Sequence, residues 1–237
     1  MSDADRIFLE TTRRFAPPRL ARDDVRIALE LAQVAPGKPL ADLGCGYGRH
    51  LRALAEQGYA EALGIDRSQL LLKEARAQAP LARLLRADLR SLPLHAGSLA
   101  AAFCFYSSMF LGSHEDSLQA LREAARVLRP LGSLVLTQDN PLRLARNPAA
   151  SFAEDVPGLG RVVEESAFEG SVDRVTKRLE MPGKAVLSAT FVIRYYPPAE
   201  LAALAVAAGL SLRRLEPDAE LTHETPQLIA LLEKNGS

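Results

Sequence analysis

The sequence has no excess of charge of either sign and contains very little cysteine. Its 237 residues include 29 Lys and Arg against 29 Asp and Glu, so the average field offers a polyanion no attraction. A nucleic-acid-binding surface is therefore not expected. The two cysteines, Cys45 and Cys104, lie in apolar stretches without CxxC spacing. We interpret them as buried thiols in a reducing cytoplasm, not as metal or redox ligands.

Other missing features also limit the class of protein. The N-terminal segment is polar and lacks the apolar core of a signal peptide, and no apolar run approaches the length of a membrane span. No internal repeat or low-complexity tract is present. The length suits one large domain, and an apolar fraction of 48% is enough for a sizeable core. We expect a cytoplasmic protein without membrane contact.

A glycine-rich segment at residues 42–48, DLGCGYG, follows a short apolar run. A dinucleotide fingerprint, G-x-G-x-x-G, requires a small residue at its last position. That position is Arg49 when the pattern starts at Gly44, and Leu51 when it starts at Gly46. A nicotinamide-dependent dehydrogenase is therefore disfavoured in both registers. The pattern D-x-G-x-G-x-G suits a ligand without phosphate, whose amino acid end lies against bare backbone.

Residues 42–48 resemble the first motif of the class I S-adenosylmethionine-dependent methyltransferases. Further segments resemble that family in the expected order: GIDRS at 64–68 its ribose-binding strand end, and RADL at 86–89 its adenine-contacting motif. Residues 125–136 resemble its helix, turn and following strand, although Leu131 replaces the first glycine of the usual Pro-Gly-Gly turn. The resemblance covers nearly the whole chain. It implies S-adenosylmethionine as cofactor and says little about the methyl acceptor.

The hydrophobic pattern predicts an α/β fold. Strand-like and helix-like segments alternate from residue 36 to 140, which implies right-handed crossovers and a mostly parallel sheet. The earlier residues predict helices broken at Pro17-Pro18. After Pro141, mixed polar and apolar strands predict a small antiparallel insert after the fifth strand, at 161–168, 172–180 and 185–195. The resemblance implies a Rossmann-like, doubly wound sheet of seven strands, closed by an antiparallel pair at 210–215 and 227–232.

The predicted organisation has four parts. They are an N-terminal helical lid and docking helix at 1–35, a cofactor-binding Rossmann-like core at 36–140, an antiparallel cap insert at 141–196 and the end of the core sheet at 197–237. We expect the insert from Asn140 to Tyr196, with the lid from Arg6 to Arg22, to select the acceptor. Functional variety usually resides in such grafted segments and mobile loops.

The predicted cofactor site lies beyond the carboxyl ends of the parallel strands, where open α/β sheets bind ligands. Asp66 ends the second strand about 20 residues past the glycines, where an acid can accept hydrogen bonds from two ribose hydroxyls. Asp88 would accept from the adenine amino group, and Asp42 would order the amino acid end. The predicted cofactor-binding residues are Asp42, Gly44, Gly46, Tyr47, Gly48, Asp66, Arg67, Asp88, Leu89, Phe105 and Tyr106.

Methyl transfer from a sulfonium needs alignment and exclusion of water more than a reactive side chain. The aromatic faces of Tyr47, Phe105 and Tyr106 could stabilise a cationic sulfonium or amine. An oxygen or carbon acceptor would need a base, whereas a neutral amine need not. The predicted catalytic residues are His114, near the end of the fourth strand, and Tyr195, at the end of the insert. A solvated histidine and a packing tyrosine are the alternatives, and no metal site is predicted.

These patterns together predict a small-molecule methyltransferase that works by direct displacement at the sulfonium methyl. Its expected partner is a small methyl acceptor, with no nucleic acid and no membrane, and a homodimer is left open. One alternative is a cofactor-binding protein without transferase activity. Another is a methyltransferase acting on RNA or protein. The sequence leaves open both the acceptor and the choice among nitrogen, oxygen and carbon.

Overall fold

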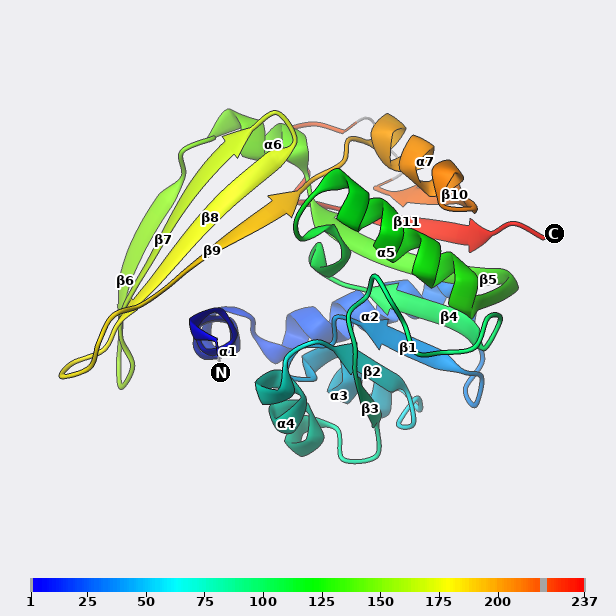
Figure 1. The fold of residues 1–237 in the computed structure, drawn as a ribbon, viewed down its shortest axis with the longest axis horizontal. Coiled ribbons are helices and arrows are strands. Elements are labelled where there is room, and N and C mark those ends of the chain that lie inside the picture. Colours follow the sequence, from blue (N-terminus) through cyan, green and yellow to red (C-terminus); the bar gives the residue numbers. More distant parts are fainter. Residues whose placement is uncertain (1, 218–220, 237) are drawn as a thin grey trace.

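A seven-stranded sheet forms the centre of the molecule (Figure 1). The computed structural model describes residues 2–217 and 221–236. In sheet order the strands are β10 (Leu210–Glu216), β11 (Gln227–Lys234), β5 (Leu128–Asp139), β4 (Leu99–Cys104), β1 (Leu40–Leu43), β2 (Leu63–Asp66) and β3 (Arg83–Arg86). Strands β1 to β5 run parallel, and β11 is antiparallel to both β5 and β10. The predicted doubly wound sheet with a closing antiparallel pair is confirmed.

Helices cover both faces of this sheet, as a mostly parallel sheet requires. One face is covered by α2 (Pro18–Ala32), α3 (Arg49–Glu56) and α4 (Gln69–Gln78), and the other by α5 (His114–Val127) and α7 (Pro198–Ala207). All six residues of β4 are buried between these layers. Ser68 caps α4, and Ser113 forms a capping box with Asp116 at the start of α5. These caps fix where both helices begin, next to the carboxyl ends of the strands.

The insert after β5 forms a separate sheet that fans away from the core (Figure 1). It contains α6 (Pro141–Arg146), β6 (Ser151–Val156), β7 (Gly160–Glu169), β8 (Val172–Glu180) and β9 (Leu187–Arg194). Its strands pair antiparallel in chain order. The sequence pattern missed β6, because five of its six residues are exposed and no polar–apolar alternation marks this edge strand.

The N-terminal helix α1 (Asp3–Phe15) lies between the insert and the core (Figure 1). Ile7 is fully buried against Val162 and Leu179 of the insert, whereas Leu9 packs with Tyr47 and Leu71 of the core. The helix therefore contacts both parts through different side chains. The chain leaves α1 at the expected proline pair, and α2 begins at Pro18.

One local expectation is wrong. The turn resembling Pro-Gly-Gly, at residues 130–132, does not separate α5 from the fifth strand, because β5 begins at Leu128 and runs through it. Leu131 has a φ of 60° there, and the pairing with β4 shifts register between Leu99 and Ala101. The segment is thus an irregularity inside a strand. No helix in the described part of the chain is long and apolar enough to cross a membrane.

Candidate active site

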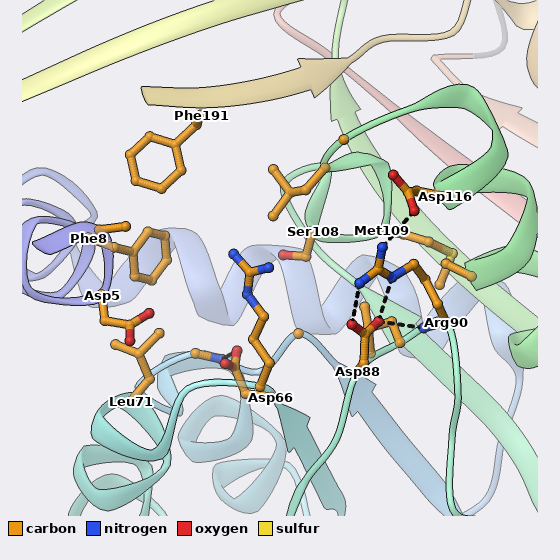
Figure 2. Close-up of a pocket in the computed structure, with 18 of the residues that line it drawn as sticks. Asp5, Phe8, Asp66, Leu71, Asp88, Arg90, Ser108, Met109, Asp116 and Phe191 are labelled. Carbon is orange, nitrogen blue, oxygen red and sulfur yellow. Dashed lines mark hydrogen bonds and ion pairs between the residues drawn. The ribbon is translucent and has the colours of Figure 1, made fainter. Parts of the chain in front are cut away.

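Two adjoining cavities lie beyond the carboxyl ends of the parallel strands. The first has a volume of about 380 Å³ and reaches from α1 to the ends of β2 and β3 (Figure 2). The second, of about 440 Å³, lies between α1, the start of α3 and the insert. Phe8, Gly44, Gly46 and Ser108 line both. The shared glycines place the loop after β1 at the junction of the two cavities.

The glycine loop needs its glycines for two different reasons. Gly44 has a φ of 79°, and a Cβ there would lie 2.6 Å from the Cβ of Ser108, so a side chain would enter the junction. Gly48 has a φ of 87° and caps α3. A Cβ at Gly48 would lie 2.8 Å from the Cα of Ala75, so this glycine permits α3 to pack on α4. Gly48 lines neither cavity, and its predicted cofactor contact stays a prediction without geometric support.

Asp66 joins the glycine loop to the end of β2. Its Oδ2 accepts a hydrogen bond from the Gly46 amide at 2.9 Å, and its Oδ1 accepts one from the Ser68 amide at 2.8 Å. Burial raises the pKa of this carboxyl group. Each carboxylate oxygen keeps a further lone pair, and Asp66 lines the first cavity together with Arg67. The predicted acid is therefore held at the cavity with acceptor capacity left over.

Asp88 is clamped by a residue that sequence reasoning missed (Figure 2). Its Oδ1 accepts hydrogen bonds of 2.9 Å from the backbone amide and Nε of Arg90, and its Oδ2 accepts one of 2.6 Å from Nη2. Arg90 also donates through Nη1 to Asp116 at 2.6 Å. These hydrogen bonds hold the pKa of Asp88 below its usual range. One Asp88 lone pair remains beside Leu89 on the cavity wall.

Two charged side chains near the glycine loop have polar atoms without partners. Asp42 is 1% exposed, and neither of its carboxylate oxygens accepts a hydrogen bond from the described residues. The buried Nη1 of Arg49 likewise finds no acceptor among them. Burial raises the pKa of Asp42 to about 7, with Arg49 opposing the shift. Buried unpaired polar atoms are rare, and such a pair of opposite sign indicates a missing ligand.

A buried polar cluster borders the second cavity. Asp24 of α2 accepts hydrogen bonds from the Tyr106 hydroxyl at 3.0 Å and lies 3.2 Å from His50 Nε2. Burial lowers the pKa of His50 to about 4, so its imidazole is neutral, and its ring stacks on Phe105 at 4.0 Å. Neither Asp24 nor His50 was predicted. His50 directly follows the glycine motif and opens a helix facing the cavity, whereas Asp24 carries no sequence signal.

Aromatic side chains form much of the wall of the second cavity. The predicted Tyr47, Phe105 and Tyr106 line it, and so do three rings that the sequence did not single out, Phe8, Phe15 and Phe152. Phe15 and Phe152 meet edge to face, with ring centroids 5.8 Å apart, where α1 touches the insert. The cavity is therefore lined by rings from α1, the core and the insert.

The two predicted catalytic residues lie elsewhere. His114 is exposed at the start of α5, where its Nδ1 is 3.3 Å from the Tyr196 hydroxyl. Tyr195 is buried, and its ring packs near Phe168 at 6.3 Å. Neither residue lines either cavity. Their catalytic role stays a prediction that no contact supports. Among the described residues, no three His, Cys, Asp or Glu side chains gather as metal ligands.

Comparison with known proteins decides the family. Residues 41–136 match the family described as "Methyltransferase domain". The "dTDP-3-amino-3,4,6-trideoxy-alpha-D-glucopyranose N,N-dimethyltransferase" of Streptomyces venezuelae is 30% identical over 186 residues, which cover 75% of this chain and 77% of that protein. The chain belongs to the S-adenosylmethionine-dependent methyltransferases. Its cofactor is S-adenosylmethionine, as the motif resemblance implies.

Two further similarities show how much of this methyltransferase is shared with other proteins. A 37.1 kDa protein from a Streptomyces fradiae transposon is 36% identical over 121 residues. These residues are 49% of this chain and only 34% of that protein. The CcbJ methyltransferase from Streptomyces caelestis superposes with a TM-score of 0.77 at 22% identity, over 92% of this chain and 90% of that one. The latter likeness shows a shared fold.

The orphaned atoms of this methyltransferase fit its cofactor. S-adenosylmethionine carries an ammonium and a carboxylate at its amino acid end, and buried atoms without partners on Asp42 and on the half-buried Arg49 belong to groups of the opposite signs. Gly44 and Gly46 line both cavities, Arg49 lines the second, and Asp42 lines neither. The spare acceptors of Asp66 and Asp88 at the first cavity are complementary to hydroxyl and amino hydrogens. These charged and polar groups therefore match a ligand in which a zwitterionic amino acid is joined to a nucleoside.

Proposed function

We propose that this methyltransferase methylates an amine nitrogen of a small molecule bound in the second cavity. The observation that carries the proposal is the aromatic wall of a cavity that shares the glycine loop with the first one. Aromatic faces attract the sulfonium of the cofactor and the ammonium ion that forms when a neutral amine takes its methyl group. The Streptomyces venezuelae relative, whose name describes transfer to the amino group of a sugar nucleotide, supports the same class of acceptor.

We assign the cofactor contacts as follows. Asp42 pairs with the ammonium and Arg49 with the carboxylate of S-adenosylmethionine, while Asp66 accepts from the ribose hydroxyls and Asp88 from the adenine amino group. Leu89, Arg67 and the glycine loop complete the first cavity. When bound, the cofactor supplies a methyl group already activated by the sulfonium. The protein contributes alignment of the acceptor and exclusion of water through the lid and the insert.

The ionisable groups on the second cavity favour an amine over a hydroxyl acceptor. Glu164 is paired with Lys177 at 2.7 Å. His50 faces Asp24, so its neutral ring is engaged in a buried cluster. A hydroxyl would need one of these groups as a base, whereas a neutral amine attacks with its own lone pair. The arrangement therefore favours a neutral amine, which needs no base before it attacks.

A labelled-methyl assay with matched acceptors tests the proposal. Each of three amines is offered beside its hydroxy counterpart: the 3-amino sugar nucleotide of the relative, glucosamine and benzylamine. We expect label in at least one amine and in none of the hydroxy counterparts. Transfer to hydroxyls alone would contradict nitrogen methylation. Cofactor binding without transfer to any acceptor would instead favour a binding protein without transferase activity.

The proposal includes no nucleic-acid partner. The balance of 29 basic and 29 acidic residues supports this. Adding transfer RNA and a protein mixture to the same assay checks it, since label in either polymer would contradict it. Light scattering in solution decides between a monomer and the homodimer that the sequence leaves open.

A further inference from the structure

We propose that the Tyr106 hydroxyl oxygen accepts a hydrogen bond from the acceptor amine and orients its nitrogen, and that Asp24 positions Tyr106 for this task. The inference deepens the proposed function and rests on it. Tyr106 lies on the wall of the second cavity and is 40% exposed, so a ligand there can reach it. Sequence reasoning had placed this ring against the cofactor.

The backbone holds Tyr106 in an unusual conformation. Tyr106 and Ser107 have φ values of 54° and 57°, two successive non-glycine residues in the left-handed region. Thr137 of β5 stabilises this turn, because its Oγ1 accepts from the Tyr106 amide at 2.8 Å and its carbonyl accepts from the Ser107 amide at 2.9 Å. Non-glycine residues in this region cluster at functional sites, where the surrounding structure maintains them. Here the result is a ring directed to the cavity wall.

The surroundings of the hydroxyl decide which way its hydrogen bonds run. Tyr106 donates its single hydroxyl proton to Asp24 Oδ2 at 3.0 Å, so the hydroxyl has no further hydrogen to give. His50, which shares Asp24, is neutral. The Arg49 guanidinium carbon lies over the Tyr106 ring, 4.4 Å from its centroid, and a hydrogen bond from the Arg49 side chain to the hydroxyl partly offsets the effect of burial on the pKa of Tyr106. Beside the lone pair that Arg49 can occupy, the phenolic oxygen keeps a second one for a donor in the cavity. An amine N–H is such a donor, and its own lone pair stays free for methyl transfer.

Asp24 belongs to the acceptor side of the molecule. It is 5% exposed and lies on α2, outside the residues 41–136 that match the methyltransferase family. Asp24 lines neither cavity itself. Asp24 touches Tyr106 and His50 and acts through them. It is thus a positioning residue.

The test compares Tyr106→Phe with Tyr59→Phe, a matched loss of one tyrosine hydroxyl. Tyr59 donates to the Val34 carbonyl at 2.6 Å, away from both cavities. With the amines of the labelled-methyl assay, we expect kcat/KM to fall about tenfold or more in Tyr106→Phe and to stay within about twofold in Tyr59→Phe. Affinity for S-adenosylhomocysteine should stay within about twofold in both variants.

Asp24→Asn, with the exposed neighbour Asp23→Asn as control, tests the positioning role. Burial, followed by the charge of Asp24, raises the pKa of Tyr106 to about 12. Ultraviolet titration, corrected with Tyr106→Phe, should show this pKa lowered in Asp24→Asn and unchanged in Asp23→Asn. The amine kcat/KM should fall in Asp24→Asn alone. An unchanged tyrosine pKa together with unchanged kcat/KM would overturn the role of Asp24.

Three outcomes separate this inference from the proposed function. Amine methylation that survives Tyr106→Phe overturns the inference and leaves the proposed function standing. A loss of S-adenosylhomocysteine affinity in Tyr106→Phe also overturns it, since Tyr106 would then serve the cofactor. If the wild-type protein methylates no amine, both the inference about Tyr106 and the proposed function are contradicted. A selective fall in kcat/KM with retained cofactor affinity supports both.

Discussion

The two cavities are built in different ways. The first is formed mainly by strand ends, the glycine loop and acids whose spacing the sequence shows, such as Asp66 and Asp88, with a smaller contribution from α1 and β9. The second takes many of its walls from α1 and the insert, including Phe15, Phe152 and Lys177, which lie outside the matched residues 41–136. The first cavity is therefore defined mainly by backbone geometry, and the second mainly by side chains of α1 and the insert.

Polar groups in the two regions also differ in how they are satisfied. Asp42 and Arg49, beside the glycine loop, keep buried atoms without partners. Asp24, beside the acceptor cavity, already holds His50 and Tyr106. Unpaired buried atoms lower the stability of the empty protein and are relieved by a complementary ligand. The proposed cofactor region is therefore expected to gain most from its ligand, whereas the polar groups beside the second cavity are already paired.

Replacing Asp66 with alanine should give the largest effect on cofactor binding. The change removes the acceptor for the Gly46 and Ser68 amides as well as the proposed ribose contact. We expect S-adenosylhomocysteine affinity to fall by about 2–3 kcal/mol, as for loss of a charged hydrogen-bonding group. Calorimetric titration of the folded variant measures this. Unchanged affinity would move ribose binding elsewhere and weaken the contrast between the cavities.

Replacing Arg49 with methionine should have the next largest effect. Methionine keeps much of the side-chain volume but cannot pair with a carboxylate, so affinity for S-adenosylhomocysteine should fall by about 1.5–2 kcal/mol. Arg52→Met is the matched control, because Arg52 lies one turn further along α3 and pairs with Glu56 at 3.1 Å on the surface. The same titration should find the control within about 0.5 kcal/mol of the wild type. Equal losses in both variants would contradict a specific anchor.

The pH dependence of cofactor affinity tests Asp42. Because its pKa is raised to about 7 in the empty protein, Asp42 is protonated below that pH and pairs poorly with an ammonium. Affinity for S-adenosylhomocysteine should therefore rise as the pH increases through about 7, by up to about tenfold. Asp42→Asn should bind more weakly at high pH and remove this dependence. A wild-type profile that is flat across this range would contradict the pairing.

The same variant should affect stability in the opposite direction. An acid whose folded pKa is raised destabilises the fold at high pH, and the penalty disappears as the pH falls toward its ordinary value of 3.8. Asp42→Asn should increase the free energy of unfolding by about 1–2 kcal/mol above the raised pKa, since its amide still lacks partners. Near pH 4 the two proteins should unfold alike. Denaturant titration at both pH values measures the difference.

What the sequence could predict follows this division. Strand order and the positions of Gly44, Asp66 and Asp88 follow from apolar runs and local motifs, because parallel strands bring their carboxyl ends together. The hydrogen bonds that join Asp24 to His50 and Tyr106 depend on how α2 docks on α3. No local pattern records such a long-range contact. Arg90 is only partly predictable. Its position two residues after Asp88 is compatible with a hydrogen bond to that acid, but the sequence does not identify its second partner, Asp116.

Substitution of the predicted catalytic residues is expected to have the smallest effect on methylation. Sequence position placed His114 and Tyr195 near strand and insert ends, but packing turned them away from both cavities, His114 toward Tyr196 and Tyr195 toward Phe168. A residue's place along the chain fixes its element, whereas its neighbours fix where its side chain points.

His114→Ala should therefore leave amine methylation within about twofold of the wild type, because an exposed side chain away from the cavities has little to lose. Tyr196→Phe, which removes the partner hydroxyl, should do the same. Steady-state kinetics and S-adenosylhomocysteine affinity are measured on the same preparations, with Tyr106→Phe beside them as the variant expected to lose turnover. If His114→Ala lost turnover with its cofactor affinity intact, the base predicted from the sequence would be restored. The acceptor would then have to reach the start of α5, and the second cavity would lose its assignment.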